Sequence, residues 1–119
     1  MTVLCVHPIS NKDVNISSAA AYGEVKTVNS RYIYIDEVEE EQIPTTFVSR
    51  MLKAVDEFDT ESDYLLIAGD HLQLIALSAM LTERWGSFKV LRYDREAKGY
   101  APVEIWGAGT RDFLERVDA

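Results

Sequence analysis

Two imidazoles and two carboxylates follow the predicted strands of a parallel sheet, and such side chains can bind a divalent metal or divide acid and base roles. His7 ends the first strand, Asp70 and His71 end the third, and Asp94 ends the fourth. Ligands of open α/β sheets bind at the carboxyl ends of the strands, so this edge is a candidate ligand site. Its candidate residues are His7, Asn29, Gly69, Asp70, His71 and Asp94. We assign no catalytic residue, metal or cofactor to it.

The junction at Gly69, Asp70 and His71 also has a purely structural interpretation. Asp70 stands where a helix is predicted to begin, three residues before Gln73, which is the spacing of a capping box. An N-cap carboxylate occupies the N–H donors that a bound phosphate needs, and it repels the phosphate as well. The single glycine here is not a G-x-G-x-x-G or P-loop motif. We therefore expect a corner of the fold at this position.

The elements that must position these residues alternate between strands and helices. Apolar periodicity predicts strands over 2–7, 24–28 and 64–68, a strand or extended link over 31–35, and a hairpin of 88–94 with 100–106. Between and after them it predicts helices over 15–23, from Pro44 to 58 and over 72–84, and a short helix from 110. Pro102 assigns the second hairpin strand to the sheet edge. This order predicts a single domain over 1–119, a three-layer α/β/α sandwich. Its sheet is expected to be mostly parallel, with four to five strands and an antiparallel edge hairpin.

The helix over 72–84 is apolar on almost every side. Eight of the ten residues in LQLIALSAML are apolar, and Gln73 and Ser78 do not share a face. A helix of this kind is expected to be buried all round, either by the C-terminal segment or by a second copy of the chain. We predict a homo-oligomer, with self-association through Leu72, Leu74, Ile75, Leu77, Met80 and Leu81.

A second group of residues suggests a surface for a partner. The acidic run between residues 36 and 41 precedes a helix, where acids stabilise the positive end of the helix dipole, but it would also suit a basic partner. Alternation along residues 32–35 places two tyrosines on one face, as on a half-exposed sheet face or a contact surface. The candidate partner residues are Tyr32, Tyr34, Asp36, Glu37, Glu39, Glu40 and Glu41.

Composition excludes several classes of protein. The net charge is −8, from 20 acids against 12 bases, and the bases are spread along the sequence, which argues against direct nucleic-acid binding. The sequence has neither a membrane-spanning run of about 20 apolar residues nor a secretory signal. Cys5 is the only cysteine and lies in an apolar strand, so we expect a buried thiol and a reducing, cytoplasmic location.

Three runs resemble a group of small α/β proteins encoded by tailed bacteriophages. The runs are SAAAYGEV at 18–25, DYLLIAGDHLQLIALSAMLTERWG at 63–86 and VLRYDREAKGY at 90–100. The resemblance carries no activity and no catalytic residue over to this chain. It implies phage origin, a host-cell cytoplasm and non-enzymatic modulation of a host protein.

Three functions remain open from the sequence. The first is an accessory protein that binds a host protein through its acidic and aromatic surface. The second is a nucleotide- or metabolite-binding protein, or a metal-dependent enzyme, that uses the carboxyl edge of the sheet. The third is a structural component of the virion.

Overall fold

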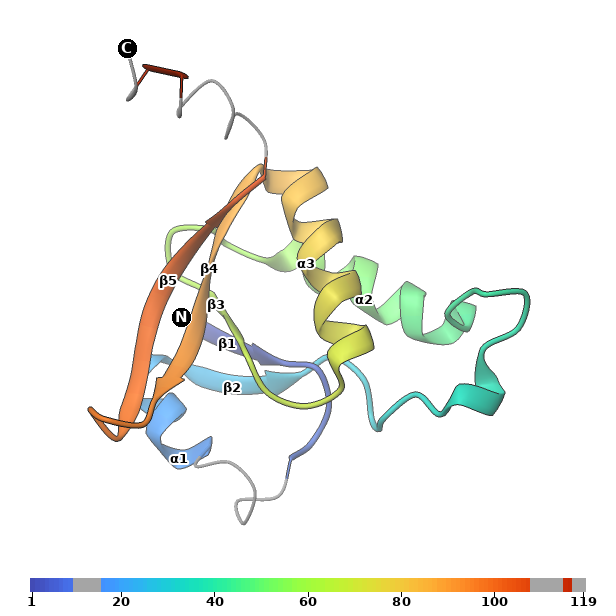
Figure 1. Cartoon of the computed structure of the whole chain (residues 1–119), viewed down its shortest axis with the longest axis horizontal. Coiled ribbons are helices and arrows are strands. Elements are labelled where there is room, and N and C mark those ends of the chain that lie inside the picture. Colours follow the sequence, from blue (N-terminus) through green and yellow to red (C-terminus); the bar gives the residue numbers. More distant parts are fainter. Residues whose placement is uncertain (10–15, 108–114, 117–119) are drawn as a thin grey trace.

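The computed structural model describes residues 1–9, 16–107 and 115–116, and within them it places five strands in one mixed sheet. The strands are β1 (Thr2–Cys5), β2 (Glu24–Thr27), β3 (Tyr64–Leu66), β4 (Ser87–Asp94) and β5 (Gly99–Trp106). Their order across the sheet is β2-β1-β3-β4-β5 (Figure 1). The first four are parallel and β5 is antiparallel to β4, so the predicted mostly parallel sheet with an antiparallel edge hairpin is confirmed.

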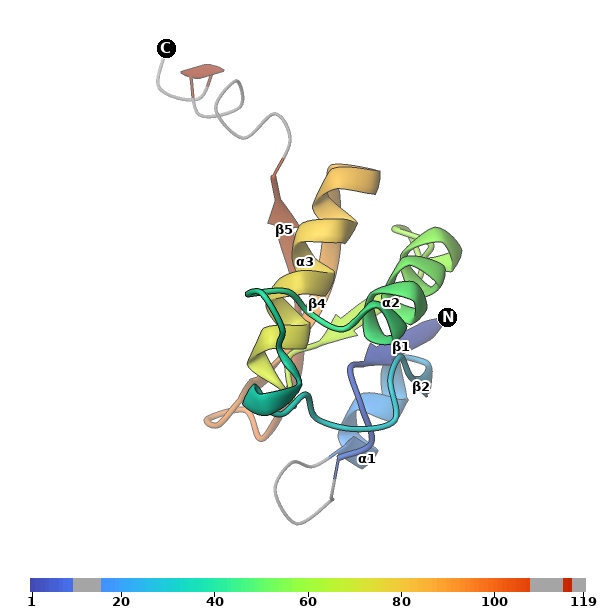
Figure 2. The ribbon, with the colours of Figure 1, turned by 90° about the vertical axis from the view of Figure 1, so that its right-hand side faces the viewer.

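Helices cover both faces of this sheet. On one face lie the short α1 (Ile16–Ala19) and the 3-10 helix η1 (Ala20–Tyr22), which contact the sheet through Ala19 and Tyr22. On the other face lie α2 (Thr45–Glu57) and α3 (His71–Trp85) (Figures 1 and 2). The predicted three layers are therefore present, although the α1 layer is thin.

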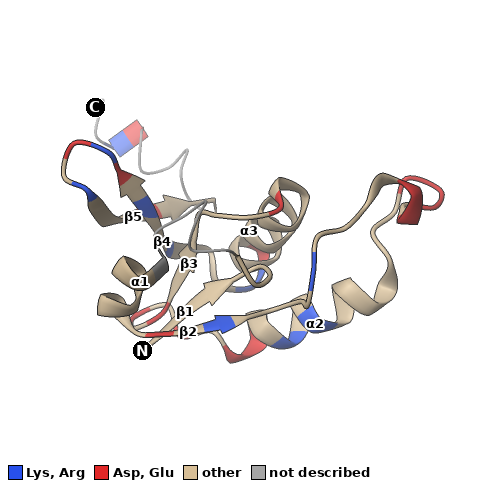
Figure 3. Cartoon of the chain, turned by 90° about the horizontal axis from the view of Figure 1, so that it is seen from below, with Lys and Arg blue, Asp and Glu red and all other residues tan. Residues whose placement is uncertain are grey.

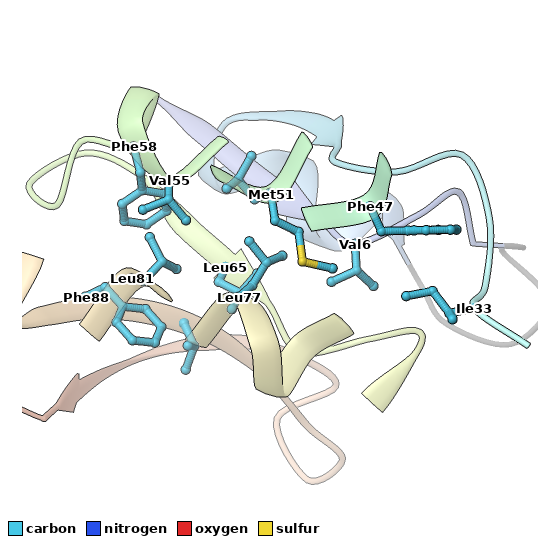
Figure 4. Close-up of a cluster of buried hydrophobic side chains, with 12 residues drawn as sticks. Val6, Ile33, Phe47, Met51, Val55, Phe58, Leu65, Leu77, Leu81 and Phe88 are labelled. Carbon is cyan, nitrogen blue, oxygen red and sulfur yellow. The ribbon is translucent and has the colours of Figure 1, made fainter. Parts of the chain in front are cut away.

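The larger core lies between the sheet and the pair of helices α2 and α3. Its apolar side chains from α2 recur at intervals of four, four and three residues, which places them on one helix face. Figure 4 shows these side chains opposite those of α3, above Leu65 of β3. The members contributed by and just after α2 are Phe47, Met51, Val55 and Phe58, and those from α3 are Leu77 and Leu81.

The central strand β1 explains the continuous apolar run near the start of the chain. Val3 and Cys5 belong to the core under α1, whereas Leu4 and the following Val6 belong to the core under α2 and α3. A strand that is covered on both faces needs apolar residues at consecutive positions rather than at alternate ones. Cys5 is buried as expected, and this burial raises the pKa of its thiol.

Strand β5 forms one edge of the sheet, as Pro102 predicted. The N–H of Gly107, just after β5, donates to the carbonyl of Gly86, just before β4 (3.1 Å). Backbone groups in an antiparallel strand point alternately toward and away from the partner strand, so the odd-numbered residues of β5 bond to β4. The even-numbered residues therefore direct their N–H and C=O groups toward the free edge. There Pro102 has no N–H, and the carbonyl of Tyr100 accepts a hydrogen bond from the Tyr22 hydroxyl (2.7 Å). These two features obstruct pairing with a further strand along the first half of the edge.

Helix α3 is buried on one side only within the single chain, and its cover by a second copy stays a prediction. Leu77 and Leu81 are fully buried within the chain, but Leu72 is exposed and the side chain of Ile75 is 68% exposed. Gln73 occupies one of the fully buried positions, so the apolar pattern of the helix is not its burial pattern within the chain. Two other residues predicted for self-association pack partly buried against the larger core, namely Leu74 and Met80.

Several predicted elements lie partly outside the described residues. The helix predicted over 15–23 begins, within the described part, at Ile16. The helix predicted from 110 is described only at residues 115–116, which are helical, so the proposed cover of α3 by the C-terminal segment lies outside the described residues. The segment 31–35 is an extended link that leads into a 3-10 helix, η2 (Ile35–Glu37).

No helix in the described part of the chain is long and apolar enough to cross a membrane.

The strand order has a direct consequence for the candidate site. After β1 the chain continues to β2, which lies on one side of β1, and after β3 it continues to β4, which lies on the far side of β3. The connections that follow the neighbouring strands β1 and β3 therefore run in opposite directions across the sheet. Such a switch point is where open α/β sheets bind ligands, beyond the carboxyl ends of the strands. His7 follows β1 and Asp70 follows β3, which brings both residues to this position.

Candidate functional site

Asp70 lies at the switch point, with only 3% of its surface exposed. Its Oδ1 accepts a hydrogen bond from the backbone N–H of Leu72 (3.0 Å), which confirms Asp70 as the N-cap of α3. Its Oδ2 accepts from the backbone N–H of Ile33 and from Nε2 of Gln73, both at 3.0 Å. The carboxylate thus serves three donors at once, and it stands where a phosphate on the helix N-terminus would have to bind.

Gln73 links Asp70 to residues that follow β2. This fully buried side chain donates from Nε2 to the carbonyl of Arg31 as well as to Asp70, both at 3.0 Å. Its Oε1 accepts a hydrogen bond from Nδ2 of Asn29 (3.0 Å). The expected capping box is therefore altered, since Gln73 contacts the Asp70 carboxylate rather than the Asp70 backbone N–H.

His7 is the partner of that backbone N–H. The N–H of Asp70 donates to Nε2 of His7 (3.1 Å), and Nδ1 of His7 lies 2.9 Å from the carbonyl oxygen of Pro8. Because Nε2 accepts, the pattern assigns the proton to Nδ1 in a neutral imidazole that donates to Pro8. The ring also meets that of Tyr32 edge to face, with centroids 6.4 Å apart.

The structure brings some of the predicted edge residues together and leaves others apart. His7, Asn29 and Asp70 share one network, beside Gly69, where an added Cβ would come within 2.9 Å of Val6. His71 is exposed on the first turn of α3.

Asp94 has a separate structural role in the β4–β5 turn. Its Oδ1 accepts from the backbone N–H groups of Glu96 and Ala97, at 3.0 and 3.4 Å. Across residues 1–9, 16–107 and 115–116, no three His, Cys, Asp or Glu side chains gather as potential ligands of a metal ion.

The main effect of the buried network is to hold the β2–α2 loop, residues 28–44. Asp70 and Gln73 together bind the Ile33 N–H and the Arg31 carbonyl, and the Ile33 side chain is buried in the larger core. Beyond this anchor the guanidinium of Arg31 makes two hydrogen bonds to the Glu37 carboxylate and lies 5.2 Å from the Phe47 ring centre. The buried network therefore holds the backbone of the loop against the core.

The pKa of Glu37 is lowered by its contacts within the loop. The hydrogen bonds from Arg31 lower the pKa of the Glu37 carboxyl to about 2, and the backbone N–H of Tyr34 (3.0 Å) contributes to the same shift. Glu37, predicted as a partner-contact residue, is therefore engaged inside the loop. Its charge fixes the first turn after Tyr34.

Three apolar or aromatic side chains point outward from this held segment. Ile35 is 88% exposed, and Tyr34 and Tyr32 are 58% and 50% exposed. The two tyrosine rings lie side by side, with centroids 5.6 Å apart. The tyrosines are thus neighbours as expected, but on a loop rather than on a strand, because the Ile33 N–H is bonded to Asp70 and not to another strand.

The loop then makes a tight acidic turn. Glu39 and Gln42 form a single antiparallel bridge, and the two residues between them have positive φ, 51° at Glu40 and 61° at Glu41. Left-handed backbone is costly for residues other than glycine, so this turn is strained. Figure 3 shows acidic residues gathered at this projecting end of the molecule.

We refer to the exposed part of the loop as the tyrosine–acid surface. It comprises Tyr32, Tyr34, Ile35, Asp36, Glu39, Glu40 and Glu41, all of which are exposed.

The residues whose contacts hold the loop under this surface were not predicted from the sequence. Gln73 was assigned only to a helix cap, and Arg31 and Ile33 were given no role. One signal was available, namely a glutamine inside a nearly apolar helix, because a buried amide must find hydrogen-bond partners. No local pattern could show that those partners follow β2.

Comparisons with known proteins place the chain in a family. Neither the curated proteins nor the solved structures contain a match to it. A family model described as phage Pam3 gp32-like protein matches residues 6–106. The match runs from the residue after β1 to the last residue of β5, and it includes the buried network and the whole tyrosine–acid surface. The chain therefore belongs to the family of phage Pam3 gp32-like proteins.

Proposed function

We propose that this phage-family protein acts without catalysis, by binding a host protein through the tyrosine–acid surface. The observation that carries the proposal is the 88% exposure of Ile35, between a pair of adjacent tyrosines and a run of acids. Burying such an isoleucine against a partner would contribute about 1.5–3 kcal/mol. Exposed aromatic and aliphatic anchors of this kind commonly carry most of the energy of an interface.

The anchoring of the loop supports a binding role. A flexible loop loses conformational entropy when it binds, whereas a loop held in its bound shape does not. Here Asp70 and Gln73 bind the backbone of the loop from the core, and Arg31 fixes Glu37 within it. The exposed side chains are therefore presented on a prepared backbone.

The chemistry of the surface defines the partner. Ile35 and the ring of Tyr34 suit an apolar pocket, and the acids beside them suit lysine or arginine at its rim. Rim charges mainly speed association and lose effect as salt screens them. The expected partner is a protein of the host cytoplasm with an apolar pocket and a basic border.

The proposal is tested with two serine variants as baits. Ile35→Ser removes the central apolar side chain of the surface, while the control Leu52→Ser removes an exposed apolar side chain of α2 that lies outside this surface. Host lysate is passed over the wild type and both variants, and the retained host proteins are quantified by mass spectrometry. We expect one host protein to be retained by the wild type and Leu52→Ser and lost by Ile35→Ser.

Salt dependence provides an independent check. Changing Glu39, Glu40 and Glu41 to glutamine should slow association with the same host protein, and the difference from the wild type should shrink as salt is raised. Equal retention by the wild type and Ile35→Ser would contradict the proposal.

We also propose self-association through the outer side of α3. The support is the exposure of Ile75 and Leu72 on a helix whose other face is packed in the core. Leu77 and Leu81 take no part in this contact because they are fully buried within the chain.

A further inference from the structure

Two cavities lie beside helix α2, one against strand β2 and one against the start of the β2–α2 loop, and we call them the β2–α2 cavities. The larger, of about 340 Å³, has a polar wall that includes Thr2, Lys26, Thr27, Arg50 and Lys53. The smaller, of about 240 Å³, is lined by Asn29, Ser30, Arg31, Thr46, Phe47 and Arg50. Arg50 lines both cavities.

Basic side chains are concentrated around these cavities, although the protein as a whole is acidic. Three of the 12 bases in a chain of net charge −8 line the larger cavity, and Figure 3 shows basic positions on β2 next to those on α2. Within the described residues, Lys26, Arg50 and Lys53 form neither an ion pair nor a side-chain hydrogen bond. Unpaired bases around a cavity indicate a site for an anion.

The acids near these bases do not neutralise them all. Asp63 lines the larger cavity, but its carboxylate accepts hydrogen bonds from the backbone N–H groups of Thr2 and Asp59, both at 2.9 Å. Glu57 is the other acid on that wall. Among the described residues, no carboxylate lines the smaller cavity, whose charged side chains are Arg31, which is paired with Glu37, and the unpaired Arg50.

A buried amide oxygen beside the smaller cavity provides a second observation. Nε2 of Gln73 faces two acceptors, Asp70 and the Arg31 carbonyl, so Oε1 of Gln73 must face Asn29. Asn29 therefore presents Nδ2 to Gln73, and its own Oδ1 is buried with no hydrogen-bond partner among the described residues. A buried carbonyl oxygen in this state lacks the donor that such groups normally have, and Asn29 lines the smaller cavity, where a ligand would bring an O–H or N–H group.

We propose that the β2–α2 cavities bind a small phosphorylated molecule that carries hydroxyl groups. Its phosphate would lie at Arg50, where the hydroxyls of Ser30 and Thr46 are also available, and a hydroxyl would approach Asn29. A guanidinium suits phosphate because it donates two parallel hydrogen bonds.

The dimensions of the cavities select the size of the ligand. A volume of about 340 Å³ is at the lower limit of ordinary ligand pockets, which favours a monophosphate over a dinucleotide. The rest of the molecule would extend toward Lys26 and Lys53. This site is separate from the tyrosine–acid surface, and the inference does not depend on the proposed host partner.

Ribose 5-phosphate is the probe, with ribose and inorganic phosphate as its two parts. Binding is measured by titration calorimetry of the wild-type protein at constant ionic strength. We expect ribose 5-phosphate to bind more tightly than inorganic phosphate, and ribose not to bind. The side-chain amide signals of Asn29 in nitrogen-15 NMR should shift with ribose 5-phosphate, which a purely structural asparagine would not show.

Two glutamine variants with the same net charge separate the site from general charge effects. Arg50→Gln should weaken binding of ribose 5-phosphate by about tenfold, whereas Arg95→Gln, in the β4–β5 turn, should not change it. Both side chains are exposed, so neither change disturbs the core, and thermal melts check this.

Several results would overturn the inference. They are absence of heat with both phosphate probes at millimolar concentration, equal loss of affinity in both variants, and inorganic phosphate binding as tightly as the ester. Binding of a single-stranded oligonucleotide without binding of ribose 5-phosphate would also overturn it, in favour of a nucleic-acid surface.

Discussion

The Asp70 carboxylate accepts a hydrogen bond from the backbone N–H of Ile33 at 3.0 Å, across 37 residues of sequence. This contact joins the start of α3 to the β2–α2 loop, in a part of the chain where both residues are buried. Losing it would leave a buried N–H without a partner. The exposed loop is therefore coupled to the stability of the core.

Two substitutions of Asp70 separate its capping role from its role as a loop anchor. Asp70→Ser keeps an N-cap oxygen for the Leu72 N–H but loses the contacts with Ile33 and Gln73, and Asp70→Ala loses all three. We expect Asp70→Ala to lower the free energy of unfolding by about 3 kcal/mol. Asp70→Ser should lose about 1 kcal/mol less, because serine is a good N-cap. Urea denaturation measures both values.

Hydrogen exchange provides the control for this interpretation. The amide of Ile33 should exchange faster in both variants, because both remove its acceptor. Unchanged exchange at Ile33 would mean that Asp70 only caps the helix.

The sequence contains enough information for the layers and the sheet. The apolar runs at β1 and β3, the amphipathic α2 and the edge residue Pro102 each follow from local periodicity and backbone chemistry. The burial of α3 does not follow from periodicity, because its pattern is apolar on nearly every side. The contacts of Gln73 with Asn29 and Asp70 mark the side that faces inward.

The candidate site shows the same limit more strongly. His7, Asn29 and Asp70 could be placed at one edge from the strand ends, and the structure joins them in one network, with Asn29 linked through Gln73. Their connection to Arg31 and Ile33 depends on the path of a loop with no repeating pattern. The bases of the β2–α2 cavities also come from separate segments, so their proximity is a property of the fold alone.

The acidic turn stores strain that can be removed. Glu40 and Glu41 both have positive φ, where asparagine and glycine are favoured. The double change Glu40→Asn and Glu41→Gly should raise the free energy of unfolding by about 1 kcal/mol. A double change of the same two residues to glutamine removes the same charges but keeps the strained backbone, so it should give no comparable gain. A similar gain in both variants, measured by urea denaturation, would assign the effect to charge.

The ion pair between Arg31 and Glu37 predicts a dependence on acid. The pKa of Glu37 is lowered from 4.5 to about 2, so the folded state favours its charged form. The resulting stabilisation is fully present above pH 4.5 and is lost as the pH falls toward 2. Arg31→Gln should raise the pKa of Glu37, though not fully to 4.5, because the Tyr34 N–H still donates to it. Carbon-13 NMR of the carboxyl measures the pKa, and Arg50→Gln, which leaves this ion pair intact, should not change it.

Two apolar residues on the same helix, Leu77 and Ile75, distinguish the core side of α3 from its outer side. Leu77 is fully buried, so Leu77→Ala should lower the free energy of unfolding by about 3 kcal/mol through the cavity it leaves. Ile75 is 68% exposed, so Ile75→Ala should change the unfolding of the isolated chain by less than about 0.5 kcal/mol. Urea denaturation at low protein concentration gives both values.

Sedimentation then tests the outer side of α3 as a contact between copies. If Ile75 lies in that contact, Ile75→Lys must shift the protein toward the monomer, because a buried unpaired ammonium is far more costly than an exposed one. Leu77→Ala should keep the wild-type oligomeric state at concentrations where it is folded, since Leu77 does not reach the surface. A wild-type protein that sediments as a monomer at every concentration would contradict self-association. The difference in unfolding between Leu77→Ala and Ile75→Ala would still hold, because it depends only on which side of α3 faces the core.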